Sequence, residues 1–141
     1  MKRIAFVLVA AVTLSGGIAL ATPGSGLVPT EVGRRTVQHV HIDESKPSDI
    51  VVVTTAYDPG GYSGWHSHPG PVVVAVTKGQ LKLTNGDCKS KTYHKGDIFR
   101  EHPGQVYNGV DNGKTPTTLV ATYFGVPVGG EVRIDEPDPG C

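Results

Sequence analysis

Glycine and proline interrupt the sequence at short intervals, and the runs between them are β-branched or alternate between apolar and polar residues. The whole chain contains 19 glycines and 11 prolines. Short strands separated by such turn residues are typical of a β-sandwich or a small barrel. After residue 21 no segment shows the 3.6-residue period of an amphipathic helix. The sequence therefore predicts an all-β domain.

The expected strands cover residues 36–42, 50–56, 72–77, 80–84, 92–93, 96–102 and 117–124, with a further edge strand at 131–134. Residues 72–77 read VVVAVT, an apolar run that we expect to be buried on both faces of its sheet. Asn85-Gly86 is a hairpin signal, because both residues tolerate a positive φ angle.

The first residues have the pattern of an export signal. Lys2 and Arg3 precede an apolar stretch, and Ala19-Leu20-Ala21 offers small residues for a signal peptidase. We therefore divide the chain into a signal peptide (1–21), a flexible leader (22–34) and one domain (35–141). Cleavage would leave no stable membrane anchor, so the predicted location is secreted or in the cell envelope.

The net charge of the chain after signal cleavage is close to zero. Without Lys2 and Arg3 the chain has 11 basic residues against 13 acidic ones, a formal charge of −2. This balance does not favour nucleic acid. The sequence also has no phosphate-binding glycine loop, so we expect no nucleotide cofactor.

The mature chain contains two cysteines, Cys88 and Cys141. In an exported protein an even number of cysteines favours a disulfide, with free thiols or an intermolecular link as the alternatives. The bond would join residues 53 positions apart. Closing a loop of that length removes about 4 kcal/mol of chain entropy from the unfolded state.

Two histidines one residue apart, His66 and His68, stand directly before the apolar run at 72–77. Residues two apart in a strand point to the same face, so both imidazoles would enter one cavity if that face is interior. Two imidazoles are ligands for Fe, Mn, Ni, Cu or Zn. Alternatively, they could line a pocket and orient a polar small molecule by hydrogen bonds.

The surroundings of this pair resemble the two motifs of a small, single-domain, exported bacterial cupin. The first motif is matched by Gly60, His66, His68 and Gly79, and the second by Gly96, Asp97, Pro103, Gly104 and Asn112. The resemblance implies a cupin-like jelly-roll β-barrel, also called a double-stranded β-helix. It also implies a divalent metal that is often held by His, His, Glu and His, and it leaves a homodimer open.

Two of these four ligands are absent. Pro71, Val72 and Val73 stand where the family places its glutamate, and Tyr107 stands where it places the last histidine. Tyr107 as a phenolate could bind a ferric ion. Glu101 and His102 are the other substitutes, but their opposite strand parity allows at most one of them to face inward. We favour His102, because imidazole serves more metals.

These residues support two functions of different kinds. The first is a cupin that binds a small molecule, a divalent metal (Fe, Mn, Ni or Zn), or both, through His66 and His68. The second is a metal-dependent enzyme of the dioxygenase or isomerase type. The two missing ligands favour binding over turnover, because catalytic metal sites usually keep three protein ligands. An interaction protein with an empty barrel is a third reading.

Overall fold

Antiparallel pairing of short strands builds the domain. The computed structural model describes Arg34 and residues 47–141. The expected signal peptide (1–21), almost all of the leader, the expected start of the domain at residue 35 and the strand expected at 36–42 lie outside the described residues.

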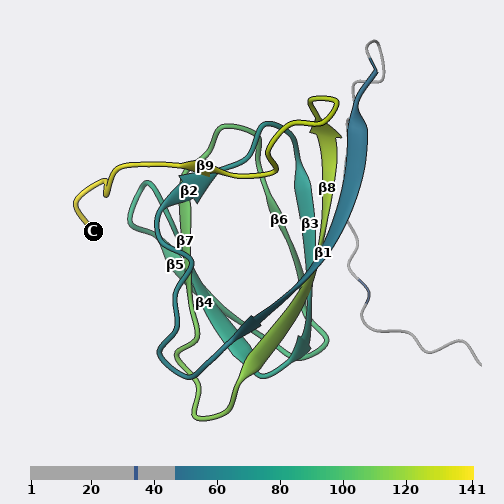
Figure 1. The fold of residues 1–141 in the computed structure, drawn as a ribbon. Coiled ribbons are helices and arrows are strands. Elements are labelled where there is room, and N and C mark those ends of the chain that lie inside the picture. Colours follow the sequence, from purple (N-terminus) through teal and green to yellow (C-terminus); the bar gives the residue numbers. More distant parts are fainter. Residues whose placement is uncertain (1–33, 35–46) are drawn as a thin grey trace, which may run out of the picture.

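Nine strands lie within residues 47–141: β1 (Asp49–Tyr57), β2 (His66–Ser67), β3 (Val72–Lys78), β4 (Gln80–Asn85), β5 (Ser90–His94), β6 (Ile98–Glu101), β7 (Tyr107–Val110), β8 (Thr117–Val126) and β9 (Ile134–Asp135). They form a four-stranded sheet in the order β1-β8-β3-β6 and a five-stranded sheet in the order β5-β4-β7-β2-β9. The two sheets face each other across one interior, as Figure 1 shows.

The predicted all-β class and jelly-roll architecture are confirmed. β1, β3, β4 and β8 agree with the expected ranges to within two residues at each end. The edge strand expected at 131–134 forms later, as β9 at Ile134–Asp135. Within the described residues no helix is long and apolar enough to cross a membrane.

The expectation that residues 72–77 are buried on both faces is wrong. Val72, Val74 and Val76 are buried, whereas the residues between them are only partly buried. An antiparallel sheet in a two-sheet fold packs one face on the core and leaves the other partly open to solvent. The valine run is therefore an alternating strand whose outer positions also happen to be apolar or β-branched.

The interior of the barrel is filled from both sheets. The buried cluster comprises Val72, Val74, Val76, Leu81, Leu83, Phe99, Tyr107, Leu119 and Ala121. Val74 lies opposite Phe99 on β6 and Ala121 on β8, which forms one row of side chains across three strands. In the adjacent row Val72 lies opposite Glu101 and Tyr123, so a carboxylate enters the same interior.

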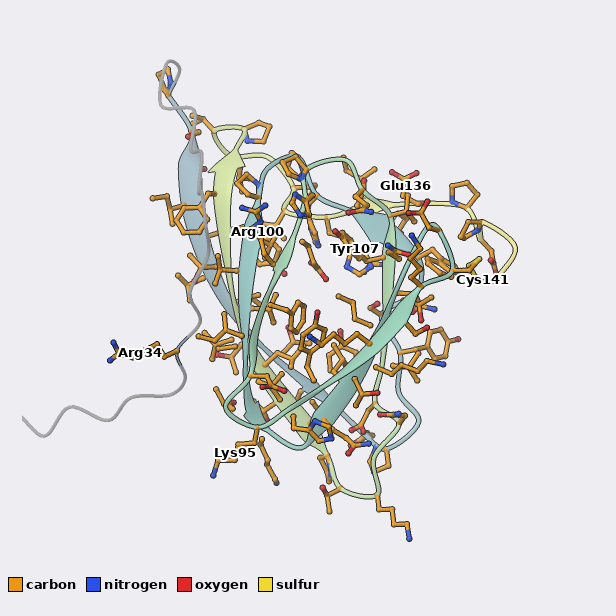
Figure 2. All side chains as sticks on the ribbon, turned by 180° about the vertical axis from the view of Figure 1, so that it is seen from behind. Arg34, Lys95, Arg100, Tyr107, Glu136 and Cys141 are labelled. Atoms are coloured by element: carbon orange, nitrogen blue, oxygen red, sulfur yellow. A yellow bond between two sulfur atoms is a disulfide. The ribbon has the colours of Figure 1, made fainter. Side chains whose placement is uncertain are left out.

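The disulfide predicted between Cys88 and Cys141 is present, with Cα atoms 5.4 Å apart. Cys88 lies in the turn between β4 and β5 and has a positive φ of 61°. Figure 2 places Cys141, Glu136 and Tyr107 toward one end of the barrel, and Lys95 at the other end.

Gly70, in the loop that joins β2 to β3, provides a test of this packing. A Cβ atom there would overlap the carbonyl oxygen of Phe124, a backbone atom that cannot move without displacing its strand. We expect Gly70→Ala to lower the free energy of unfolding by about 3 kcal/mol, as overpacked sites do. Urea denaturation measures this change.

Gly86→Ala is the matched control. A Cβ atom at Gly86 would meet only ordinary contacts with Val106, at 3.5 Å. Its effect should stay below about 1 kcal/mol. Equal losses in the two variants would contradict the described approach of the β2–β3 loop to Phe124.

Candidate metal centre

Three buried side chains converge inside the barrel: His66, His68 and Glu101. One ligand atom from each lies within 4.8 Å of the others. His66 belongs to β2, His68 follows it directly, and Glu101 is the last residue of β6. The two histidines therefore come from one sheet and the carboxylate comes from the other.

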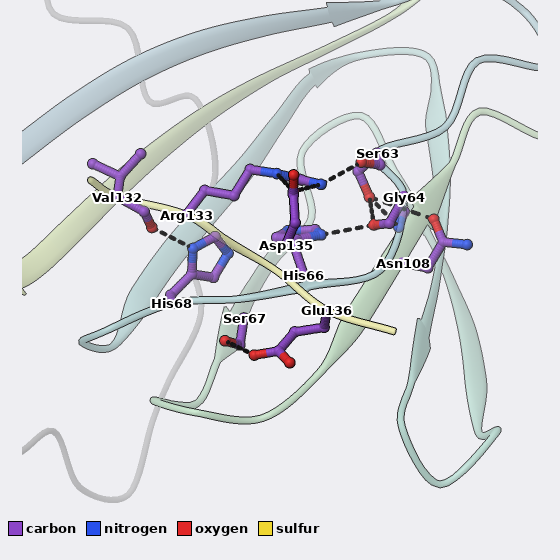
Figure 3. A network of polar contacts seen from close by, with 11 residues as sticks. Ser63, Gly64, His66, Ser67, His68, Asn108, Val132, Arg133, Asp135 and Glu136 are labelled. Carbon is purple, nitrogen blue, oxygen red and sulfur yellow. Dashed lines mark hydrogen bonds and ion pairs between the residues drawn. The ribbon is translucent and has the colours of Figure 1, made fainter. Parts of the chain in front are cut away.

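Backbone carbonyls fix the orientation of both imidazoles. The Nδ1 atom of His66 lies 2.9 Å from the carbonyl oxygen of Gly64, and that of His68 lies 2.7 Å from the carbonyl oxygen of Val132. A carbonyl oxygen only accepts, so Nδ1 carries the hydrogen in each ring. This arrangement, drawn in Figure 3, directs the Nε2 atoms away from the backbone partners, as is usual for metal-binding histidines.

Glu101 takes the place of the missing glutamate from a different strand. Glu101 on β6 pairs with Val72 on β3, and Val72 is one of the residues that stand where the family places its carboxylate. Glu101 is 5% exposed, and its Oε2 atom lies 2.9 Å from Nε2 of His68. The Nδ1 atom of His68 is already hydrogen-bonded to Val132, so Nε2 of His68 and Oε2 of Glu101 are the atoms that an ion between the two residues would bind.

The donor set fits a divalent transition metal. Two atoms bound at about 2.1 Å in adjacent positions of one ion lie about 3 Å apart, and at most about 4.2 Å apart when they are opposite. The His68–Glu101 distance of 2.9 Å matches the first case, and the 4.8 Å limit on the cluster requires at most a small inward shift. Two imidazoles and a carboxylate suit Fe, Mn, Ni and Zn.

His102, the substitute that we favoured, does not join this cluster. Its side chain is exposed, and both ring nitrogens lie 3.3 Å from Nη2 of Arg100. Strand parity explains the correction. Phe99 faces the core, so Glu101, two residues later on β6, faces the same way, whereas Arg100 points to the outer side.

Tyr107 is buried opposite His66, but its hydroxyl is used elsewhere. It donates a hydrogen bond to Oε1 of Gln105 and accepts one from the backbone N–H of His102. Burial raises the pKa of the Tyr107 phenol above 10.0, which keeps it protonated and makes it a poor ligand. His66, His68 and Glu101 are thus the predicted residues that the structure brings together.

Two tyrosines that sequence reasoning missed stand beside the cluster. A cavity of ≈50 Å³ in the barrel is lined by the three candidate ligands together with Tyr57 and Tyr123. The ring of Tyr123 meets the ring of His68 edge-on, with centroids 5.2 Å apart. Burial first, and the nearby carboxylate of Glu101 second, raise the pKa of both phenols above 10.0, so they remain hydrogen-bond donors.

An open pocket of ≈460 Å³ lies next to the inner cavity. Its walls include His66, His68, Tyr57 and Tyr123, and Arg133 stands in its lining. The guanidinium of Arg133 donates to the carbonyl oxygen of Ser63 at 2.8 Å and forms an ion pair with the carboxylate of Asp135 at 2.8 Å. A molecule in this pocket would reach both imidazoles from the solvent side.

The two facing antiparallel sheets form a double-stranded β-helix, and two histidines and a carboxylate lie inside it. The sequence matches the Cupin domain family over residues 53–123, which is just over half of the 141 residues. The chain belongs to the cupin family. No curated protein matches the sequence.

Solved structures show the same fold. A double-stranded β-helix protein of Klebsiella pneumoniae is 28% identical, over 56% of this chain and 66% of its own, with a TM-score of 0.52. A Cupin 2 conserved barrel domain protein from Salinispora arenicola is 20% identical, over 62% of this chain and 72% of its own, with a TM-score of 0.50. Oxalate oxidase is 23% identical, over 54% of this chain and 42% of its own, with a TM-score of 0.50.

At identities below 25% the last two likenesses concern the fold alone. The aligned part also spans slightly under two thirds of the Klebsiella chain and less than half of the oxalate oxidase chain.

Burial sets the charge state of His66 at neutral pH. It disfavours the imidazolium and lowers the pKa of His66 below 6.5. The carbonyl of Gly64 and the carboxylate of Glu101 oppose the shift, but they do not cancel it. Neutral His66 keeps its Nε2 lone pair for a ligand at pH 7.

A pH titration of stability tests this assignment in metal-free buffer. A lowered folded-state pKa means that unfolded His66 takes up a proton first, so stability is complete above pH 6.5 and is lost as the pH falls below it. One group contributes at most about 1.4 kcal/mol per pH unit. We expect His66→Asn to show a shallower decline below pH 6.5 than the parent protein in urea denaturation.

His94→Asn is the control for this titration, because the side chain of His94 is 65% exposed. Its decline should match that of the parent protein. A His66→Asn profile parallel to the parent profile would show that His66 does not titrate as its burial requires.

Proposed function

We propose that this cupin binds one divalent transition-metal ion through Nε2 of His66, Nε2 of His68 and the carboxylate of Glu101, and takes a small polar ligand beside it. The main support is the orientation of the histidines: backbone carbonyls occupy both Nδ1 atoms, so the Nε2 atoms are the ring nitrogens that remain for an ion in the cluster. The Nε2 atom of His66 has no hydrogen-bond partner within residues 47–141.

Three protein ligands leave coordination positions open for water or a ligand. A bound ion would act there as a Lewis acid on an oxygen atom of that ligand. The protonated phenols of Tyr57 and Tyr123 line the same cavity and could donate hydrogen bonds to such an oxygen. The inner volume of ≈50 Å³ admits only a small group, while the rest of the molecule would occupy the outer pocket.

A metal-dependent enzyme of the dioxygenase or isomerase type is the second candidate. It is favoured by the third ligand, Glu101, whose carboxylate completes a two-histidine, one-carboxylate set. Sets of this kind with open positions hold Fe²⁺ in oxygenases. Turnover of a substrate by the metal-loaded protein, and its loss in Glu101→Gln, would distinguish this candidate from a binding protein.

We also propose that the protein acts outside the cytoplasm, in the cell envelope or as a secreted protein. The Cys88–Cys141 disulfide supports this location, because such bonds persist mainly in oxidising compartments.

The metal content of the purified, untagged protein tests the proposed function. After incubation with Fe²⁺, Mn²⁺, Ni²⁺ or Zn²⁺ and removal of excess ion, we expect about one ion per chain for at least one metal. His66→Ala and His68→Ala should each lose most of it, since two remaining ligands hold an ion weakly. Glu101→Gln should also bind more weakly, by about 10-fold or more. Inductively coupled plasma mass spectrometry measures the content.

His102→Ala is the matched control, because it also removes an imidazole but one that lies outside the cluster. It should retain the full metal content. The proposal fails if no metal is retained by the parent protein, or if His102→Ala loses as much as His66→Ala.

A further inference from the structure

The last 15 residues, 127–141, cross the end of the barrel as a strap after β8 ends at the buried Val126. No residue of this strap is buried, and only Val132, Arg133 and Glu136 are partly buried. Two of its three large apolar side chains, Val128 and Ile134, are 68% and 49% exposed, and the third, Val132, is only partly buried. Hydrophobic burial therefore contributes little to holding the strap in place.

Polar contacts nevertheless join the strap to the segment that carries the two histidines. β9 pairs with β2 through His66 and Ser67. The hydroxyl of Ser67 donates to Oε1 of Glu136 at 2.7 Å, and the backbone N–H of Glu136 donates to the carbonyl of Trp65 at 3.0 Å. Figure 3 shows the contact between Ser67 and Glu136, with His66 and His68 beside it.

One of these contacts acts directly on a candidate ligand. The carbonyl of Val132 accepts the Nδ1 hydrogen of His68, and this bond leaves Nε2 facing Glu101. β2 is only two residues long and has a single paired position with β7 on its other side. The strap therefore provides much of the backbone pairing that holds the histidine segment.

The far end of the strap is fixed covalently. Cys141 is bonded to Cys88 in the β4–β5 turn, while the near end continues from β8. With both ends attached, the polar contacts form at a smaller entropy cost than the ordering of a free tail would require.

We propose that this disulfide-fastened strap is an outer shell of the metal centre, and that the Cys88–Cys141 bond is required for full metal affinity although neither cysteine is a ligand. The inference rests on the proposed metal-binding function. Without the Val132 carbonyl, His68 is free to rotate or to carry its hydrogen on Nε2, which then has no lone pair for an ion. Loss of such an outer partner typically weakens metal binding 10- to 100-fold.

The test is the dissociation constant of Zn²⁺, measured by chelator competition for the full chain and for the double variant Cys88→Ser, Cys141→Ser. We expect binding by the double variant to be about 10- to 100-fold weaker, with the stoichiometry unchanged at saturation. Hydrogen exchange should show faster exchange of the amides at 132–136, with little change in β3 and β8.

A second variant keeps the test valid if the double variant does not fold. Ser67→Ala retains the disulfide and removes only the contact with Glu136, so it should weaken Zn²⁺ binding to a smaller extent. Ser90→Ala is its matched control, because it also removes one serine hydroxyl, and that hydroxyl bonds Thr84 on the exposed β4–β5 hairpin and not Glu136. Ser90→Ala should bind Zn²⁺ as the parent protein does.

The outcomes separate this inference from the proposed function. Failure of the parent protein to bind any of the four metals overturns both. Zn²⁺ binding of equal strength in the parent protein and the folded double variant overturns the strap alone, whether or not its amides exchange faster. If the double variant does not fold, equal affinities for Ser67→Ala and Ser90→Ala overturn the strap in the same way.

Discussion

The candidate site depends on the contact between the buried carboxylate of Glu101 and the imidazole of His68. Glu101 enters the interior among valine and phenylalanine side chains, where an unpaired charge would cost several kcal/mol. The Nε2 atom of His68, from the opposite side of the barrel, lies 2.9 Å from Oε2 of Glu101. This contact spans the two sheets at the end of the barrel. The β2 segment, the strap behind it and the two tyrosines are all arranged around it.

A purely structural role for the His68–Glu101 pair would explain less of the arrangement. Such a pair needs only one histidine, and an apolar pair of similar size is often as stable. His66 adds a second buried imidazole whose Nδ1 is also held by a backbone carbonyl. Two imidazoles held by backbone carbonyls beside one carboxylate are the arrangement that a set of metal ligands requires. Packing of the barrel interior does not require it.

Turn residues between short strand-like runs predicted the all-β class, and the resemblance to the cupin motifs predicted the jelly roll. Strand parity predicted that the two histidines share a face. His66 and His68 both line the inner cavity, as their two-residue spacing predicts. The burial pattern of β3 was not predicted, because apolar residues also occupy its outer positions. For the third candidate ligand we favoured His102, because metal preference was weighed ahead of parity, whereas the structure places Glu101 in the cluster. Counting from Phe99 would have selected Glu101. The role of Val132 had no sequence signal, since it acts through a backbone carbonyl 64 residues away.

Anomalous X-ray diffraction from a crystal of the metal-loaded protein, recorded at the absorption edge of the metal, tests the central claim most directly. The account predicts one strong peak inside the barrel, about 2.0–2.2 Å from Nε2 of His66, Nε2 of His68 and a carboxylate oxygen of Glu101. A barrel with no peak, or a peak bound by other residues while Glu101 remains paired with His68, would contradict it.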